Sequence, residues 1–292
     1  MNALVRALLL ACLSALLMGC GVRTTYNNLD WLAIRWLNDQ VDLSAEQELK
    51  VRTAIERKLA WHCESELPDY IALIERIDRD VATDQITVDS LDGYGQEMMV
   101  FGRRLLDRAQ PSVLELLASM DEAQVETLIA DIDKRNEELA TEQDETTPQE
   151  RSKQLVKRMD GILRRAFGRL NPSQKSRLDQ WALERQTTAP FERQRRETRD
   201  QQFIEALAVR KDPVEFERRM DALFEPAQPD SRPESNPAQR ATAHNRTNML
   251  NTLVDIYELA DDRQIQRLRD RLEDLADDFR GVSCRDQDRA IG

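Results

Sequence analysis

Apolar residues recur at helical spacing almost without interruption from residue 26 to residue 280. Only residues 86–88 resemble a strand, and this short run directly precedes another helical pattern. The chain has 9 glycines in 292 residues and is 33% charged, a bias typical of long solvated helices rather than of sheets with tight turns. The sequence therefore predicts an all-α fold, a multi-helix bundle of about ten to twelve amphipathic helices.

Two segments interrupt the helical pattern. Residues 142–148 are acidic and poor in apolar side chains, and residues 226–237 contain four prolines, which no helix interior accommodates. These loops divide the chain into three blocks, which we expect to form one all-helical domain over residues 26–284, followed by a tail. The blocks are 26–140, 149–225 and 238–280, the tail is 285–292, and the expected helices cover 26–37, 45–62, 68–81, 90–109, 111–119, 122–140, 149–170, 172–187, 191–209, 213–225, 238–260 and 262–280.

Residues 1–19 have the features of a cleaved signal peptide. Arg6 precedes an apolar run of about a dozen residues, which is shorter than the ~20 that a membrane-spanning helix needs. The segment LMGC, ending at Cys20, resembles the lipobox of bacterial lipoproteins, in which the cysteine becomes the lipidated first residue of the mature chain. The resemblance implies a lipid anchor on Cys20 and a tether at residues 20–25. Because Gly21 rather than Asp follows the cysteine, it also implies sorting to the outer membrane, with the body facing the periplasm.

Export of this kind would bring the body into a compartment where thiols are oxidised. The chain has four cysteines, of which Cys12 lies in the signal peptide and Cys20 carries the lipid. Cys63 and Cys284 then form the only possible intramolecular pair. A Cys63–Cys284 disulfide is the leading interpretation, and two inert buried thiols are the alternative.

Four segments share a helix-start motif, in which a capping residue is followed three positions later by glutamine. The side-chain oxygen of the cap can accept from a backbone N–H of the first turn, while the glutamine reaches back to the N–H of the cap, which forms a capping box. Pro172 fits this pattern, since proline is favoured at the first helical position. The four pairs are Ser44 with Gln47, Asp121 with Gln124, Asn171 with Gln174, and Asp261 with Gln264.

This motif resembles the LTxxQ repeat of Spy/CpxP-type periplasmic proteins, which are small helical chaperones and stress modulators of the Gram-negative envelope. A second resemblance covers more of the chain. The segments YNNLDWL from Tyr26, VDLSAEQ from Val41 and ELPDY from Glu66 are similar to an uncharacterised family of proteobacterial lipoproteins of this length. That family implies no activity, so a chaperone-like role follows only from the first resemblance.

Residues that carry catalytic or metal chemistry are scarce. The two histidines, His62 and His244, stand in no Ser/His/Asp pattern and are too few for an ordinary zinc or haem site. Cys63 follows His62 directly, but adjacent helical residues point in different directions and cannot share a proton. We therefore expect no metal and no cofactor. The net charge of −12 argues against a nucleic acid as partner.

Charge is unevenly distributed along the chain. Residues 151–219 contain 18 Lys and Arg against 10 Asp and Glu, so this block is basic within an acidic protein. Two interpretations are open: pairing with acidic faces of the same chain, such as residues 121–150, or a surface for anionic lipid or an acidic partner. The possible anion-binding residues are Arg193, Arg195, Arg196 and Arg199.

Residues 26–37 are rich in aromatic side chains, although aromatics make up only 5% of the chain. The helical spacing favours a first helix whose tryptophans enter the core. The alternative is a surface that rests on the membrane beside the lipid anchor.

Two functions are compatible with these features. The first is a non-enzymatic, outer-membrane-anchored protein that binds other envelope proteins, in a chaperone-like way or as an assembly factor. The second is an envelope hydrolase acting on lipid or peptidoglycan, whose catalytic carboxylates the sequence does not identify. We favour the first because of the lipobox, the helical pattern and the helix-start motif. The expected partners are the membrane, through the anchor, and envelope protein clients or anionic lipid.

Overall fold

The computed structural model describes residues 25–26, 28–225, 236–282 and 284. These residues form helices and no strands, so the expected all-α, multi-helix fold is confirmed. The helices are α3 (Leu29–Val41), α4 (Ala45–Trp61), the π-helix η1 (His62–Glu66), α5 (Leu67–Ala82), α6 (Val88–Ser119), α7 (Glu122–Glu145), α8 (Pro148–Phe167), α9 (Pro172–Glu184), α10 (Ala189–Ala208), α11 (Pro213–Phe224), α12 (Pro237–Glu258) and α13 (Asp262–Arg280).

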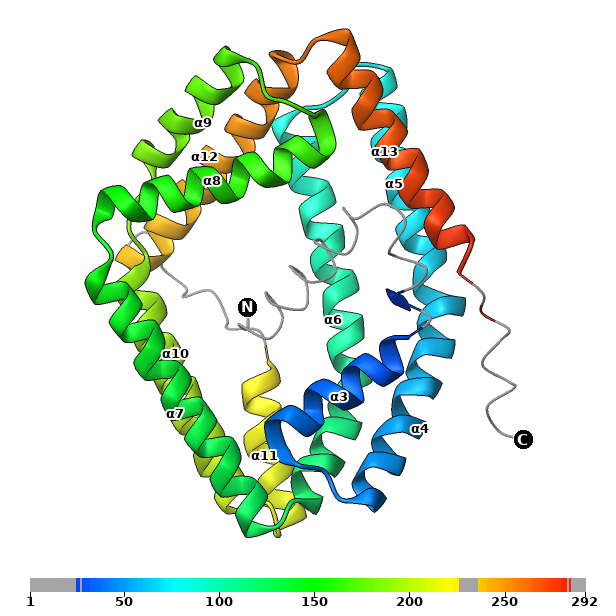
Figure 1. The fold of residues 1–292 in the computed structure, drawn as a ribbon, viewed down its shortest axis with the longest axis vertical. Coiled ribbons are helices and arrows are strands. Elements are labelled where there is room, and N and C mark those ends of the chain that lie inside the picture. Colours follow the sequence, from blue (N-terminus) through cyan, green and yellow to red (C-terminus); the bar gives the residue numbers. More distant parts are fainter. Residues whose placement is uncertain (1–24, 27, 226–235, 283, 285–292) are drawn as a thin grey trace.

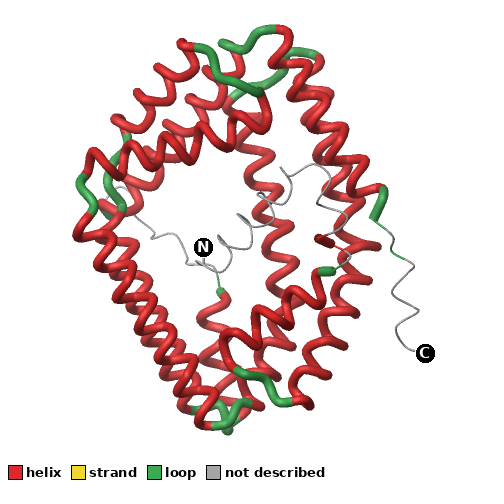
Figure 2. The backbone as a smooth tube through the Cα atoms, in the orientation of Figure 1, coloured by secondary structure: helices red, strands yellow, loops and turns green. Residues whose placement is uncertain are grey.

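The helices lie along the sides of a four-sided frame (Figure 1). α5 and α13 run side by side along one side, and α7 and α10 run side by side along the opposite one. α8, α9 and α12 occupy one corner, while α3, α4, α11 and the end of α6 occupy the corner diagonally across the frame. Figure 2 shows that the connections are short and lie mainly where the direction of the chain changes.

Several helix boundaries differ from the sequence expectation. α6 continues through Pro111, where we expected two helices. Side-chain hydrogen bonds hold both sides of this proline, since Gln110 donates to Asp221 and Ser112 accepts from Lys58. α7 extends to Glu145, so the expected loop at 142–148 is reduced to the two residues before α8. The expected proline-rich loop at 226–237 lies almost entirely outside the described residues, as do residues 1–24 and the tail at 285–292.

The buried apolar side chains form separate clusters instead of one central core. The largest two fill the opposite corners of the frame. One cluster joins α5, α8, α9 and α12 through Val81, Leu163, Phe167, Leu170, Leu178, Trp181, Ala182, Ile256 and Tyr257. The other joins the C-terminal ends of α3 and α6 to α7, α10 and α11 through Val41, Leu117, Met120, Val125, Ala206, Leu207, Phe216 and Met220.

The side formed by α5 and α13 carries the disulfide. Cys63 in η1 is bonded to Cys284, beyond the end of α13, with the two Cα atoms 5.6 Å apart. Leu67, Ile74 and Phe279 are buried beside it. The disulfide therefore joins the far ends of α4 and α13, two helices that begin at opposite corners of the frame.

Candidate functional site

The structure places all four copies of the helix-start motif at helix N-termini. Each forms a complete capping box, in which the cap side chain accepts from the glutamine N–H and the glutamine side chain accepts from the N–H of the cap. In the first, Ser44 accepts from the Gln47 backbone at 3.3 Å, and the Ser44 N–H donates to the Gln47 Oε1 at 2.9 Å. The motif begins α4, α7, α9 and α13, and capping boxes with serine or glutamate in place of glutamine begin α6 and α8.

The motifs meet in two pairs, which the sequence did not predict. At the first junction, defined by Gln47 and Gln124, the two side-chain amides bond each other. Gln47 Nε2 donates to Gln124 Oε1 at 3.0 Å, and Gln124 Nε2 donates to Gln47 Oε1 at 2.7 Å. Gln124 Nε2 also donates to the carbonyl of Asp42 at 3.0 Å, and Gln47 Nε2 donates to the Ser119 hydroxyl at 3.1 Å.

The second junction, defined by Gln174 and Gln264, repeats this plan with one change. Gln264 Nε2 donates to Gln174 Oε1 at 3.0 Å and to the carbonyl of Arg169 at 3.0 Å. Gln174 Nε2 donates instead to the backbone carbonyl of Ile256 at 2.9 Å. In both junctions, therefore, the later glutamine donates to the carbonyl two residues before the cap of the earlier motif.

All four glutamine side chains are buried at these junctions. Their polar groups are occupied by one another, by the caps and by carbonyl or hydroxyl groups. The motif therefore connects helices within this chain and leaves no free amide for a ligand at these positions. Capping was readable from local sequence, but the pairing was not, because the partners are separated by 77 and 90 residues.

The arginines proposed for anion binding line up along α10, which packs against α7. Arg193 donates to Asp144 at 2.7 Å and to Gln143 at 2.8 Å, and Arg196 donates to Asn136 at 3.1 Å. Arg195 is exposed. Burial lowers the pKa of Arg199, whose buried Nε finds no hydrogen-bond partner among the described residues. The contacts of Arg193 are those expected from pairing within the chain.

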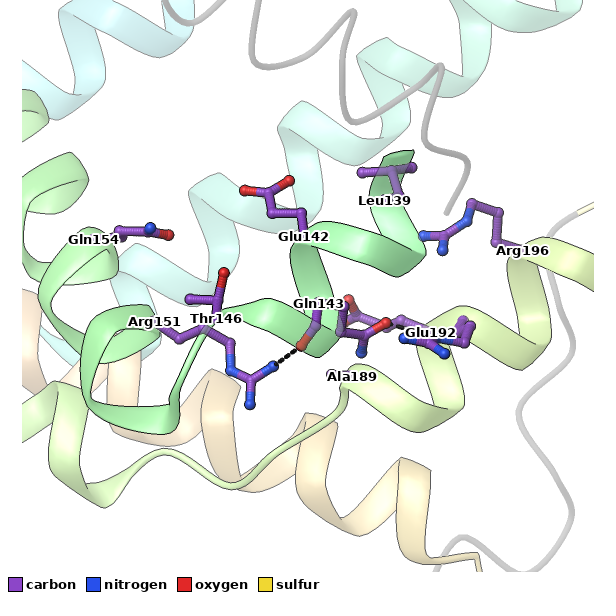
Figure 3. A pocket seen from close by; sticks show the side chains of 10 residues that line it. Leu139, Glu142, Gln143, Thr146, Arg151, Gln154, Ala189, Glu192 and Arg196 are labelled. Carbon is purple, nitrogen blue, oxygen red and sulfur yellow. Dashed lines mark hydrogen bonds between the residues drawn. The ribbon is translucent and has the colours of Figure 1, made fainter. Parts of the chain in front are cut away.

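A shallow pocket lies where the end of α7, the start of α8 and the start of α10 meet (Figure 3). Arg151, Arg193 and Arg196 contribute positive charge to its lining, while Glu142 and Glu192 contribute negative charge. Arg151 donates to the backbone carbonyl of Gln143 at 2.8 Å, as the dashed line in Figure 3 shows. The pocket thus has mixed charge, and its arginines are already bonded to α7.

His62 lies in a closely packed aromatic environment beside the disulfide. Its Nδ1 is 3.0 Å from the Tyr26 hydroxyl, and its ring stacks edge-on against Tyr70. Burial lowers the pKa of the His62 imidazole to about 4. Cys63 is occupied by its bond to Cys284, so it offers no thiolate next to this histidine.

The carboxyl groups with shifted pKa values lie in exposed or half-buried hydrogen-bonded groups. Hydrogen bonds from Arg218 and Arg219 lower the pKa of Glu215 to about 2. Similar bonds lower the pKa values of Glu46, Asp92 and Glu150. A general acid would need the opposite shift. Within the described ranges, no group of His, Cys, Asp and Glu side chains could hold a metal ion.

Sequence reasoning missed which apolar side chains are exposed. The expectation that the tryptophans of the first helix enter the core is wrong for Trp31 and Trp36, which are 52% and 53% exposed. The side chains that α3 buries are Ile34 and Val41. Exposed apolar side chains also occur at three consecutive positions of α6, at Met98, Met99 and Val100.

Cys20, the expected lipidation site, lies outside the described residues. None of the helices in the described ranges combines the length and apolar character that crossing a bilayer requires.

The fold and its junctions define a class of protein, an all-α frame whose corners are held by paired capping boxes. The chain belongs to DUF6279, a family of unknown function, whose sequence model matches residues 39–231. This range includes the whole first junction and the earlier motif of the second. The expected membership of an uncharacterised family is thereby confirmed. The chain matches no curated protein and no solved structure.

Proposed function

We propose that this protein is a lipoprotein anchored in the outer membrane through Cys20, facing the periplasm, and that it binds other envelope proteins without catalysing a reaction. The segment LMGC that ends at Cys20 supports the anchor, and Gly21 supports outer-membrane sorting. The Cys63–Cys284 pair supports the compartment, because structural disulfides persist in oxidising surroundings such as the periplasm.

The observation that carries the binding role is a run of three consecutive exposed apolar side chains on α6, Met98, Met99 and Val100, called the α6 strip below. These side chains are 40%, 47% and 56% exposed. Tyr94 and Phe101 on the same helix are buried against α5, so α6 packs against its neighbour without using the side chains of the strip. Because consecutive helical residues point in different directions, the strip follows the turn of the helix and does not lie along one face. Exposed apolar side chains that lie near one another mark interaction surfaces, and methionine adapts its shape to varied partners.

The helix-start motif supports the comparison with Spy/CpxP-type proteins in a restricted sense. Its glutamines are buried in the junctions, so they stabilise the frame and do not contact a client. A chaperone-like role in this chain therefore depends on the α6 strip.

The anchor is tested by Cys20→Ala. We expect this variant to accumulate as unprocessed precursor without a lipid label and to leave the outer-membrane fraction. A fully processed variant that still fractionates with the outer membrane would refute the anchor.

The binding role is tested by crosslinking in living cells. A photoreactive amino acid at Met99 should form adducts, whereas the same group at Glu138, an exposed position on α7, serves as the matched control. One discrete adduct at Met99 indicates an assembly partner, and many adducts indicate chaperone-like client binding. Equal or absent crosslinking at the two positions would contradict a role for the strip.

A further inference from the structure

α3 carries a second exposed apolar surface, distinct from the α6 strip. Trp31 and Trp36 are 52% and 53% exposed, and Leu29 and Leu32 are 38% and 39% exposed. The opposite side of the helix packs on α4 and α7 and buries Ile34 and Val41. α3 is therefore a helix whose inner side packs in the fold and whose outer side carries four exposed apolar side chains beside the exposed Arg35 and Asp39.

Three of the exposed side chains form a row along one side of the helix. Leu29, Leu32 and Trp36 follow each other at spacings of three and four residues, which aligns them along one side of a helix. Trp31 directly precedes Leu32 and points about 100° away from it around the helix, on the flank of this row, with the Arg35 guanidinium 5.5 Å from its ring centroid. Tryptophan with neighbouring arginine is typical of the headgroup region of a membrane, where the indole ring is half apolar and half polar.

The position of α3 in the chain identifies what covers this face. Leu29 is nine positions after Cys20. Even fully extended, a chain of this length reaches about 30 Å. If the acyl chains on Cys20 lie in the bilayer, α3 must begin close to the lipid headgroups.

We infer that the α3 face formed by Leu29, Trp31, Leu32 and Trp36 rests in the headgroup region of the membrane that holds the lipid anchor. This inference depends on the anchor in the proposed function. The contact is apolar rather than electrostatic, because Asp30 and Asp39 on the same helix offset Arg35. In Figure 1 the corner that contains α8, α9 and α12 lies across the frame from α3.

Tryptophan fluorescence tests the contact directly. The mature lipoprotein is reconstituted into phosphatidylcholine vesicles whose acyl chains are brominated close to the headgroup, and its emission is compared with that in unbrominated vesicles. The chain has four tryptophans. We expect quenching to remove up to about half of the emission, because two of the four lie on the proposed contact face.

A Trp31→Phe/Trp36→Phe variant keeps the face apolar and should lose the quenching. Adding Leu183→Trp to this variant supplies the matched control, since Leu183 is 81% exposed on α9 at the distant corner, and this new tryptophan should not be quenched. Circular dichroism verifies that each variant remains helical.

Vesicle flotation separates the two proposals. Wild-type protein that floats without quenching overturns the α3 contact and leaves the anchor standing. Quenching that persists in the double variant, or that is equally strong at position 183, also overturns the contact. Protein that does not float overturns the anchor and this inference together.

Discussion

The two junctions use the same short motif and differ in what their earlier glutamine binds. At the first junction, Gln47 binds two side chains, Gln124 and Ser119. At the second, Gln174 binds a backbone carbonyl, that of Ile256, and is completely buried. The caps show a similar difference. The side-chain amide of Asn171 donates to the backbone carbonyl of Leu259 at 2.8 Å, whereas Ser44 has no side-chain amide.

Because of this difference, the two junctions should respond differently to substitution of their glutamines. Contacts between two side chains can rearrange when one partner changes, since both ends are able to move. A backbone carbonyl held in a helix cannot follow, and a buried carbonyl without a donor costs more than a lost contact at a partly hydrated edge. We therefore expect the second junction to tolerate substitution less well than the first.

The largest expected effect comes from the disulfide, which links α4 and α13, two helices that begin at opposite corners of the frame. Replacing both cysteines, Cys63→Ala/Cys284→Ala, should lower the free energy of unfolding by about 2 to 5 kcal/mol, because the bond closes a loop of 221 residues in the unfolded chain. It should also let the two junctions unfold separately. Urea unfolding followed by hydrogen exchange checks both points, and intact mass before and after reduction establishes the bond in wild-type protein. Coincident unfolding of both corners in the variant would show that the junctions are coupled without the disulfide.

Gln174→Leu should be the most damaging single change at a junction. It removes the donor to the carbonyl of Ile256 and one of the two acceptors of the Gln264 side-chain amide in a buried site, at a cost of about 3 kcal/mol. Gln47→Leu, at the first junction, should cost about half as much. Gln180→Ala, an exposed change on the same helix as Gln174, should stay within about 0.5 kcal/mol. Chemical denaturation measures all three, and a larger loss for Gln47→Leu than for Gln174→Leu would reverse the comparison.

The amount that the sequence could predict follows from how local each feature is. A cap and its glutamine are three residues apart, so the starts of α4, α7, α9 and α13 were readable from the sequence. The choice of partner depends on packing between distant segments, and glutamine is in general more often exposed than buried. The same limit explains α6, where contacts of Gln110 and Ser112 with other helices accompany a helix that passes through Pro111.

Of these features, the disulfide was the most readily predicted from the sequence and the exposure of the tryptophans was the least. Pairing Cys63 with Cys284 followed from elimination and needed no geometry. The exposure of Trp31 and Trp36 could not be predicted, because helical spacing identifies an apolar face without saying whether another helix covers it.

Acid should destabilise the protein through His62, which lies on the side of the frame between the two junctions. The glutamines of the junctions do not titrate. The unfolded His62 imidazole has a pKa near 6.5, and burial lowers it to about 4 in the folded protein. Between these values the unfolded chain binds the additional proton, so stability falls as the pH decreases from 6.5 to 4 and is independent of this group above 6.5. We expect a loss of about 2 kcal/mol across the window, after allowing for residual hydration of the ring.

The variant His62→Gln should remove this part of the pH dependence, which denaturation at a series of pH values would reveal. His244→Gln, which changes the exposed second histidine on α12, is the matched control and should keep the wild-type slope. A wild-type slope in His62→Gln would assign the acid sensitivity to other groups.

The smallest expected effect compares the glutamine–glutamine hydrogen bonds of the two junctions most directly. In a double-mutant cycle, the coupling energy between two residues reports their direct interaction after the separate cost of each change has been subtracted. Gln47 and Gln124 exchange two hydrogen bonds, so Gln47→Ala and Gln124→Ala should be coupled by about 1 to 2 kcal/mol. Gln174 and Gln264 share one bond, so their coupling should be about half of that, although the single change at Gln174 is the more damaging. Four unfolding curves for each junction give both values. Equal couplings would mean that the backbone contacts of Gln174 do not compete with its contact to Gln264, and the two junctions would then differ only in how deeply they are buried.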